Sequence, residues 1–150
     1  MNRVLFASIM TLVGLLVNPD AGLGGKLGFK GSDGKAEQAR SAGAEDRSGP
    51  RMHQTLQRLI ELGTENVQFL TCGGRMGSSW IPKGVSEISK IDGAEPSSAQ
   101  DTINAVRKMV EEGIDLLLYS GGDGTTRDII STLQEIDRED LPLIGVPSGV

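Results

Sequence analysis

A glycine-rich segment that carries one carboxylate is the part of this sequence best suited to chemistry. An almost uniformly apolar run at residues 114–119 precedes it, and the segment itself reads Gly121-Gly122-Asp123-Gly124-Thr125-Thr126. Apolar residues with helical spacing follow it, at Ile129, Ile130, Leu133 and Ile136. The segment therefore joins a buried strand to the N-terminus of a helix, where free N–H groups and the helix dipole favour an anion. We predict a phosphate site.

Asp123 is the unusual member of this segment. A carboxylate beside a polyphosphate is repelled unless it binds a cation or takes a proton from an attacking hydroxyl, so its placement suggests a kinase. Spacing alone leaves an alternative equally open, in which Asp123 only forms a turn. The hydroxyls of Thr125 and Thr126 could cap the helix or donate to phosphate. The segment is neither a Walker-type loop nor the three-glycine dinucleotide fingerprint.

The elements that must position this segment alternate between strands and helices. Apolar runs predict strands at 13–17, 67–72, 114–119 and 143–146, with a further short strand at 85–91. Helical spacing predicts helices at about 50–62, from Ser98 to Gly113, and between residue 126 and Leu141. We therefore expect a doubly wound α/β fold with a mainly parallel sheet. The pattern leaves most of residues 73–97 unassigned.

The helix that begins at Ser98 has the clearest signals. Ser98 and Asp101 have the spacing of a capping box, with Asp in place of the usual Glu. Its predicted inner stripe is Ala99, Ile103, Val106 and Val110. A structural role at the helix start is the interpretation that we favour for Asp101.

Composition narrows the class of protein. The chain has 150 residues, 37% of them hydrophobic, which suffices for the core of one domain. Its net charge of -5 disfavours non-specific binding to nucleic acid or to an anionic membrane. The only cysteine, Cys72, and the only histidine, His53, have no partners for a disulfide or a metal site, so we expect a cytoplasmic protein with no resident metal.

The two ends of the chain carry separate expectations. The apolar run after Arg3 resembles a short signal peptide, but it is too short for a membrane span and no clear cleavage site follows. We interpret residues 1–12 as an extension or the start of the first strand, and 13–150 as a nucleotide- and phosphate-binding α/β domain. The chain stops directly after a strand and a turn signal, which suggests truncation.

The order of several motifs resembles one known family. Residues 121–125 resemble the signature shared by NAD kinases, diacylglycerol-type lipid kinases and, more distantly, phosphofructokinases. Residues 17–25, 27–34, 99–102 and 145–150 are similar to the group described as predicted polyphosphate/ATP-NAD kinases. The resemblance covers nearly the whole chain from about residue 13, in the same order.

This resemblance implies a Rossmann-like N-terminal domain, with a β-rich NAD-binding second domain that this chain lacks. It implies phosphorylation of the 2'-hydroxyl of NAD by ATP or polyphosphate with Mg²⁺, and Asp123 as the general base. Small-molecule nucleotides are the implied partners, and members of the family are often homo-oligomers. The implied cofactor-binding residues are Asn18, Gly22, Gly24, Gly25, Gly121, Gly122, Gly124, Thr125, Thr126, Ser148 and Gly149.

Two other functions stay open at this point. A lipid kinase or other small-molecule hydroxyl kinase could use the same donor segment on a different acceptor. A non-catalytic nucleotide-binding protein, related to proteins of acetoin catabolism, could keep the fold without phosphate transfer. Asn18 likewise has an alternative role, since it could cap a turn before Pro19 without touching ligand.

Overall fold

Five parallel strands form the centre of the molecule. The computed structural model describes residues 9–23 and 36–148, so the predictions for Gly24, Gly25 and Gly149 lie outside the described residues. The sheet has the strand order β3-β2-β1-β4-β5, which confirms the predicted parallel α/β fold. The strands are β1 (Thr11–Val17), β2 (Val67–Cys72), β3 (Glu87–Ile91), β4 (Leu116–Gly121) and β5 (Leu143–Pro147).

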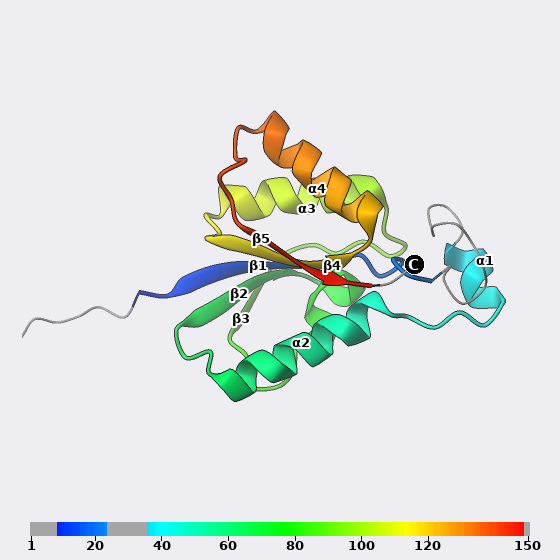
Figure 1. The fold of residues 1–150 in the computed structure, drawn as a ribbon, viewed down its shortest axis with the longest axis horizontal. Coiled ribbons are helices and arrows are strands. Elements are labelled where there is room, and N and C mark those ends of the chain that lie inside the picture. Colours follow the sequence, from blue (N-terminus) through cyan, green and yellow to red (C-terminus); the bar gives the residue numbers. More distant parts are fainter. Residues whose placement is uncertain (1–8, 24–35, 149–150) are drawn as a thin grey trace, which may run out of the picture.

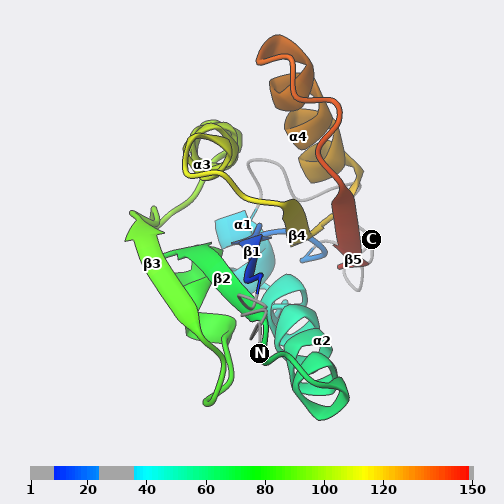
Figure 2. The same cartoon turned by 90° about the vertical axis from the view of Figure 1, so that its left-hand side faces the viewer.

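Helices cover both faces of this sheet (Figures 1 and 2). One face carries α2 (Ser48–Leu62), and the other carries α3 (Ala99–Glu111) and α4 (Asp123–Glu135). A short helix, α1 (Ala36–Ser41), lies beyond the carboxyl ends of the strands, and two 3-10 turns, η2 (Gly74–Met76) and η3 (Ser78–Trp80), follow β2. Central strands that are covered on both sides are mostly apolar, as β1 and β4 are.

The central strand β1 shows how the sequence divides between two cores. Val13, Leu15 and Val17 pack into the cluster beneath α2, whereas Leu16 belongs to the cluster beneath α3 and α4. Successive strand residues point to opposite faces, so an uninterrupted apolar run serves both clusters.

Most local signals in the sequence mark real boundaries. Gly63 and Gly113 follow α2 and α3 with φ angles of 102° and 85°, a conformation that glycine adopts without strain. Ser98 caps α3, and both hydrogen bonds of the predicted capping box are formed with Asp101. The strand that we predicted at 85–91 is β3 and begins at Glu87.

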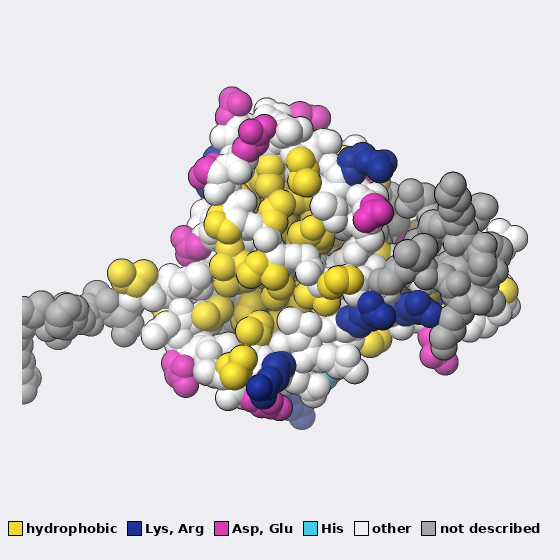
Figure 3. All heavy atoms as spheres, in the orientation of Figure 1, with side chains coloured by type: hydrophobic (Ala, Val, Ile, Leu, Met, Phe, Trp, Pro, Cys, Tyr) yellow, Lys and Arg dark blue, Asp and Glu magenta, His cyan; other side chains and the backbone are white. Residues whose placement is uncertain are grey.

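Two predictions about burial were wrong at least in part. In α3, Val106 is buried as predicted, but the other buried residues are Thr102, Ala105 and Met109. Ala99 is exposed, because the helix is rotated so that Met109 enters the core. The last strand, β5, is an edge strand rather than a buried one, and Ile144 is 53% exposed. Figure 3 has the orientation of Figure 1, in which β5 lies in front. Apolar side chains lie at the surface in the middle of this view.

Candidate functional site

The strand order changes direction between β1 and β4, which are neighbours in the sheet but distant in sequence. In open parallel sheets, ligands bind outside the carboxyl ends of the strands at such a switch point. The chain leaving β1 is tied to β4 there, because the Asn18 backbone N–H donates to the Ser120 carbonyl at 2.9 Å. The Asn18 side chain also reaches across, and its Nδ2 donates to Thr125 Oγ1 at 2.9 Å.

The glycine-rich segment supplies the first turn of α4 as well as the junction before it. Gly122 is the N-cap residue, and no side chain caps the helix there. Thr126 is the first residue whose N–H bonds back along the helix, to the Gly122 carbonyl at 3.0 Å. The preceding N–H groups of the first turn therefore lack helical partners and are placed to bind an anion.

Gly121 is the glycine that this geometry requires. A Cβ added there would lie 2.5 Å from Thr125 Cβ, far inside van der Waals contact. A Cβ on Gly122 would meet nothing within 4 Å. Gly121 thus permits the first turn of α4 to fold back over the end of β4, and Gly122 leaves the helix end open.

The two threonines of the segment have different surroundings. Thr126 Oγ1 donates to the Gly122 carbonyl at 3.1 Å and lies 2.9 Å from the Tyr119 hydroxyl, so both of its bonding directions are used within the protein. Thr125 Oγ1 accepts a hydrogen bond from Asn18 and keeps its own proton. Of the two hydroxyls, Thr125 is the one free to donate to a ligand.

The Asp123 carboxylate occupies the first position of α4. It is exposed, and it makes no hydrogen bond or ion pair with the residues that the structure describes. An Asx turn would need this carboxylate to accept a backbone N–H, so the turn-forming alternative has no support in this geometry. A free carboxylate beside an anion-binding helix end can bind a cation or accept a proton.

Asn18 has the turn-forming role that the sequence offered as the alternative to ligand contact, and it also bonds to the start of α4. Its Oδ1 accepts the Asp20 N–H at 3.1 Å, which forms an Asx turn, while its Nδ2 bonds Thr125. Gly22 follows in the same turn with a φ angle of 82°. The first loop is therefore fastened to the start of α4 by one side chain.

Ser148 contributes a buried hydroxyl on the other side of β4. Its N–H donates to the Gly121 carbonyl at 3.4 Å, and its Oγ is buried with no hydrogen-bond partner among the described residues. Buried hydroxyls without a partner are uncommon in folded proteins. A ligand oxygen is one group that would satisfy it.

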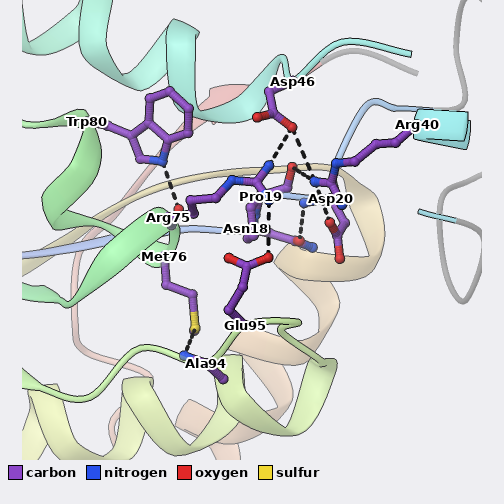
Figure 4. Close-up of polar contacts among 10 residues, drawn as sticks. All are labelled: Asn18, Pro19, Asp20, Arg40, Asp46, Arg75, Met76, Trp80, Ala94 and Glu95. Carbon is purple, nitrogen blue, oxygen red and sulfur yellow. Dashed lines mark hydrogen bonds and ion pairs between the residues drawn. The ribbon is translucent and has the colours of Figure 1, made fainter. Parts of the chain in front are cut away.

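Sequence reasoning missed a chain of ion pairs beside this site (Figure 4). Arg40 lies 2.8 Å from Asp20 and 3.2 Å from Asp46, and Arg75 lies 2.6 Å from Asp46 and 3.2 Å from Glu95. Burial opposes the charge of Arg40, but its bonds to the two aspartates outweigh that cost, and its pKa is raised. We call these five residues the ion-pair chain. No local pattern predicts it, since its members come from four separate segments.

Other candidate groups have structural roles. His53 Nδ1 donates to the Trp80 carbonyl at 2.8 Å. Burial raises the pKa of Cys72 to about 12, so this thiol is protonated at neutral pH and is a poor nucleophile. Among the described residues, no group of three or more His, Cys, Asp or Glu side chains could hold a metal ion.

One of the comparisons with known proteins identifies a family. A family model, the ATP-NAD kinase N-terminal domain, matches residues 13–150. No curated protein and no solved structure matches the chain. None of the helices in the described part of the chain is long and apolar enough to cross a membrane. Because the family match runs from β1 to the end of the chain and includes the whole switch-point site, the chain belongs to the ATP-NAD kinase family and represents its N-terminal domain.

Proposed function

We propose that this chain is the phosphate-binding part of an NAD kinase that transfers a phosphoryl group from ATP or polyphosphate to the 2'-hydroxyl of NAD. The observation that carries the proposal is the unpaired Asp123 carboxylate at the first position of α4, beside N–H groups that are free to bind phosphate. The family match supports the same chemistry. The fold by itself does not select the acceptor, so the acceptor rests on the family.

The residues of this site have distinct roles in the proposed reaction. The first-turn N–H groups of α4 and the Thr125 hydroxyl hold the phosphate oxygens, and Asn18 positions Thr125. The acceptor oxygen bonds to the transferred phosphorus while the bond from phosphorus to the leaving oxygen breaks. Asp123 takes the proton from the acceptor hydroxyl.

Mg²⁺ fits this site as an ion that arrives with the phosphates. It needs few protein ligands, because substrate phosphates and water can complete most of its shell. When bound there, the ion would neutralise charge on the phosphate oxygens. Ser148 Oγ, which has no partner among the described residues, is available to a phosphate oxygen near Gly121.

The test measures NADP formation from NAD and Mg²⁺, with ATP or polyphosphate as donor. It uses the complete reading frame that encodes this chain, with the 150-residue chain beside it. Replacing Asp123→Asn keeps the side-chain size but removes the base, so the rate should fall by about 10²- to 10⁴-fold. Asp128→Asn is the matched control, because Asp128 lies one turn later on α4, and it should keep most of the activity.

The outcomes separate the three candidate functions. Nucleotide binding without NADP formation, together with transfer to a lipid or another alcohol, would replace NAD as the acceptor. Nucleotide binding without transfer to any acceptor would indicate a non-catalytic binding protein. Equal activity of Asp123→Asn and the unchanged protein would remove Asp123 from the base role.

A further inference from the structure

A cavity of about 430 Å³ opens at the carboxyl ends of β2 and β3. Its lining residues belong to the segment 73–97, most of which the sequence pattern left unassigned. Residues directly after the two strands line it, among them Gly73, Arg75, Ile91, Asp92, Gly93 and Glu95. Small-molecule sites commonly have volumes in this range and lie outside the carboxyl ends of parallel strands.

Glycine backbone forms much of the cavity wall. The Gly73 N–H donates to the Ile91 carbonyl at 2.9 Å, and a Cβ on Gly93 would lie 1.9 Å from the Gly73 carbonyl oxygen. The two segments therefore touch backbone to backbone. A Cβ on Gly74 would meet nothing within 4 Å. Bare backbone of this kind, with the apolar Ile91 and Ala94 also in the lining, can approach a flat ring closely.

The charges of the cavity favour a ligand that donates hydrogen bonds. Arg75 is already bound on both sides, by Asp46 and by Glu95 (Figure 4). Asp92 is exposed in the lining and makes no hydrogen bond or ion pair with any described residue. Among the lining residues that the structure describes there are two carboxylates and one guanidinium that is already paired, and this excess of negative charge disfavours phosphate. Carboxylates accept from sugar hydroxyls, as the acidic residue of dinucleotide-binding folds does from ribose.

The cavity lies within reach of the phosphate site. In the order β3-β2-β1-β4, the space between β2 and β3 is two to three strands away from β4. Neighbouring strands lie about 4.8 Å apart, so the cavity is about 12 Å from the start of α4. The ion-pair chain spans this interval, from Asp20 after β1 to Glu95 after β3. One extended nucleotide could occupy both places.

We propose that this cavity binds the nucleoside end, ribose and base, of the nucleotide whose phosphates lie at the N-terminus of α4. This assignment rests on the proposed function, because it takes the phosphate site as the other anchor. Asp92 is assigned to the ribose hydroxyls, and Ala94 with the glycine backbone to the base. ATP would present its adenosine end, and NAD its nicotinamide riboside end, because the proposed reaction places the adenosine 2'-hydroxyl of NAD at Asp123. The shared chemistry is that of a nucleoside.

Titration calorimetry of the chain with ATP, NAD and inorganic tripolyphosphate tests the assignment. Asp92→Asn removes the carboxylate charge, and Ala94→Leu reduces the cavity volume. Each variant should weaken binding of at least one nucleotide by roughly tenfold. Tripolyphosphate, which has no nucleoside, should bind as tightly as it does to the unchanged chain. Asp137→Asn is the matched control, because Asp137 is an exposed aspartate at the other end of α4 and tolerates Asn at its φ of 54°.

Each outcome has a definite meaning. Weaker binding of ATP alone assigns the cavity to the donor, and weaker binding of NAD alone assigns it to the acceptor. If both variants fold and bind ATP and NAD unchanged, the assignment is wrong while the phosphate site stands. An equal loss of tripolyphosphate binding in Asp92→Asn would also overturn it. If the unchanged chain binds no tripolyphosphate and no nucleotide, the proposed function fails and this assignment fails with it.

Discussion

At the residue scale, Gly121 lies where β4 ends and the first turn of α4 folds back over it. The backbone there is not unusual in its φ angle, so the need for glycine comes from the neighbouring Thr125 side chain. Thr125 in turn holds Asn18. The absence of a Cβ at Gly121 therefore controls how the first loop and the first turn of α4 meet.

We predict that Gly121→Ala lowers the free energy of unfolding by about 1 to 3 kcal/mol, because the new Cβ would lie 2.5 Å from Thr125 Cβ. The shifted turn should also bind tripolyphosphate more weakly. Urea unfolding and calorimetry measure the two effects. Gly122→Ala is the control, since a Cβ there meets open space. Equal effects of the two substitutions would contradict this account of Gly121.

At the element scale, α2 packs closely against the turn that follows β2. At one position of α2, close packing requires a glycine although helix propensity favours alanine. Gly49 is the second residue of α2, and a Cβ there would lie 2.0 Å from the Trp80 ring. Trp80 is held in place by a hydrogen bond from its Nε1 to the Arg75 carbonyl at 2.7 Å. The packing of Trp80 against α2 therefore requires a glycine at position 49.

We predict that Gly49→Ala destabilises the protein by about 1 to 3 kcal/mol, although alanine is favoured over glycine in a helix by about 1 kcal/mol. In a Trp80→Leu background the clash is removed, and the same change should be neutral or stabilising. Thermal unfolding of the four proteins in this double-mutant cycle measures the coupling. A coupling energy near zero would contradict the packing argument.

The elements differ in how far local sequence could predict them. The capping box of Ser98 and Asp101 and the glycines after α2 and α3 act within a few residues, and those boundaries were predicted correctly. The buried face of α3 was not, because the sheet and α4 decide which side of an amphipathic helix meets the core. The spacing of apolar residues is compatible with several rotations of α3 about its own axis, and packing against the sheet and α4 selects one of them.

At the scale of the whole molecule, Asp46 connects segments that are far apart in the sequence. It accepts hydrogen bonds from Arg40 of α1 and from Arg75 of η2, and those two arginines also contact Asp20 and Glu95. About a third of the Asp46 side chain is exposed, so solvent screens these pairs in part. The network still joins the loop after β1 to the lining of the cavity after β3.

We predict that Asp46→Asn lowers the free energy of unfolding by about 1 to 2 kcal/mol, because it leaves two half-buried arginines with one partner less. The difference should shrink in high salt. Glu61→Gln is the control, since the Arg58–Glu61 pair is exposed and lies within one helix. Its loss should cost less than about 0.5 kcal/mol. Urea unfolding at two salt concentrations distinguishes the two cases.

The sequence by itself was sufficient to predict the alternation of strands and helices, the parallel α/β class and the position of the glycine-rich segment between a strand and a helix. These features follow from the spacing of apolar residues and from the conformations of single residues, which act over a few positions. These local features single out Asp123 and Thr125 without any contact between distant residues.

Only the tertiary structure decided how distant segments meet. Asn18 bonds Thr125 across 107 residues of sequence, and β5 is the outer strand of the sheet that the described residues form. The ion-pair chain and the cavity after β2 and β3 arise from strand order and register in the same way. Local periodicity carries no information about strand order or register. Both depend on the packing of the whole sheet between its helices.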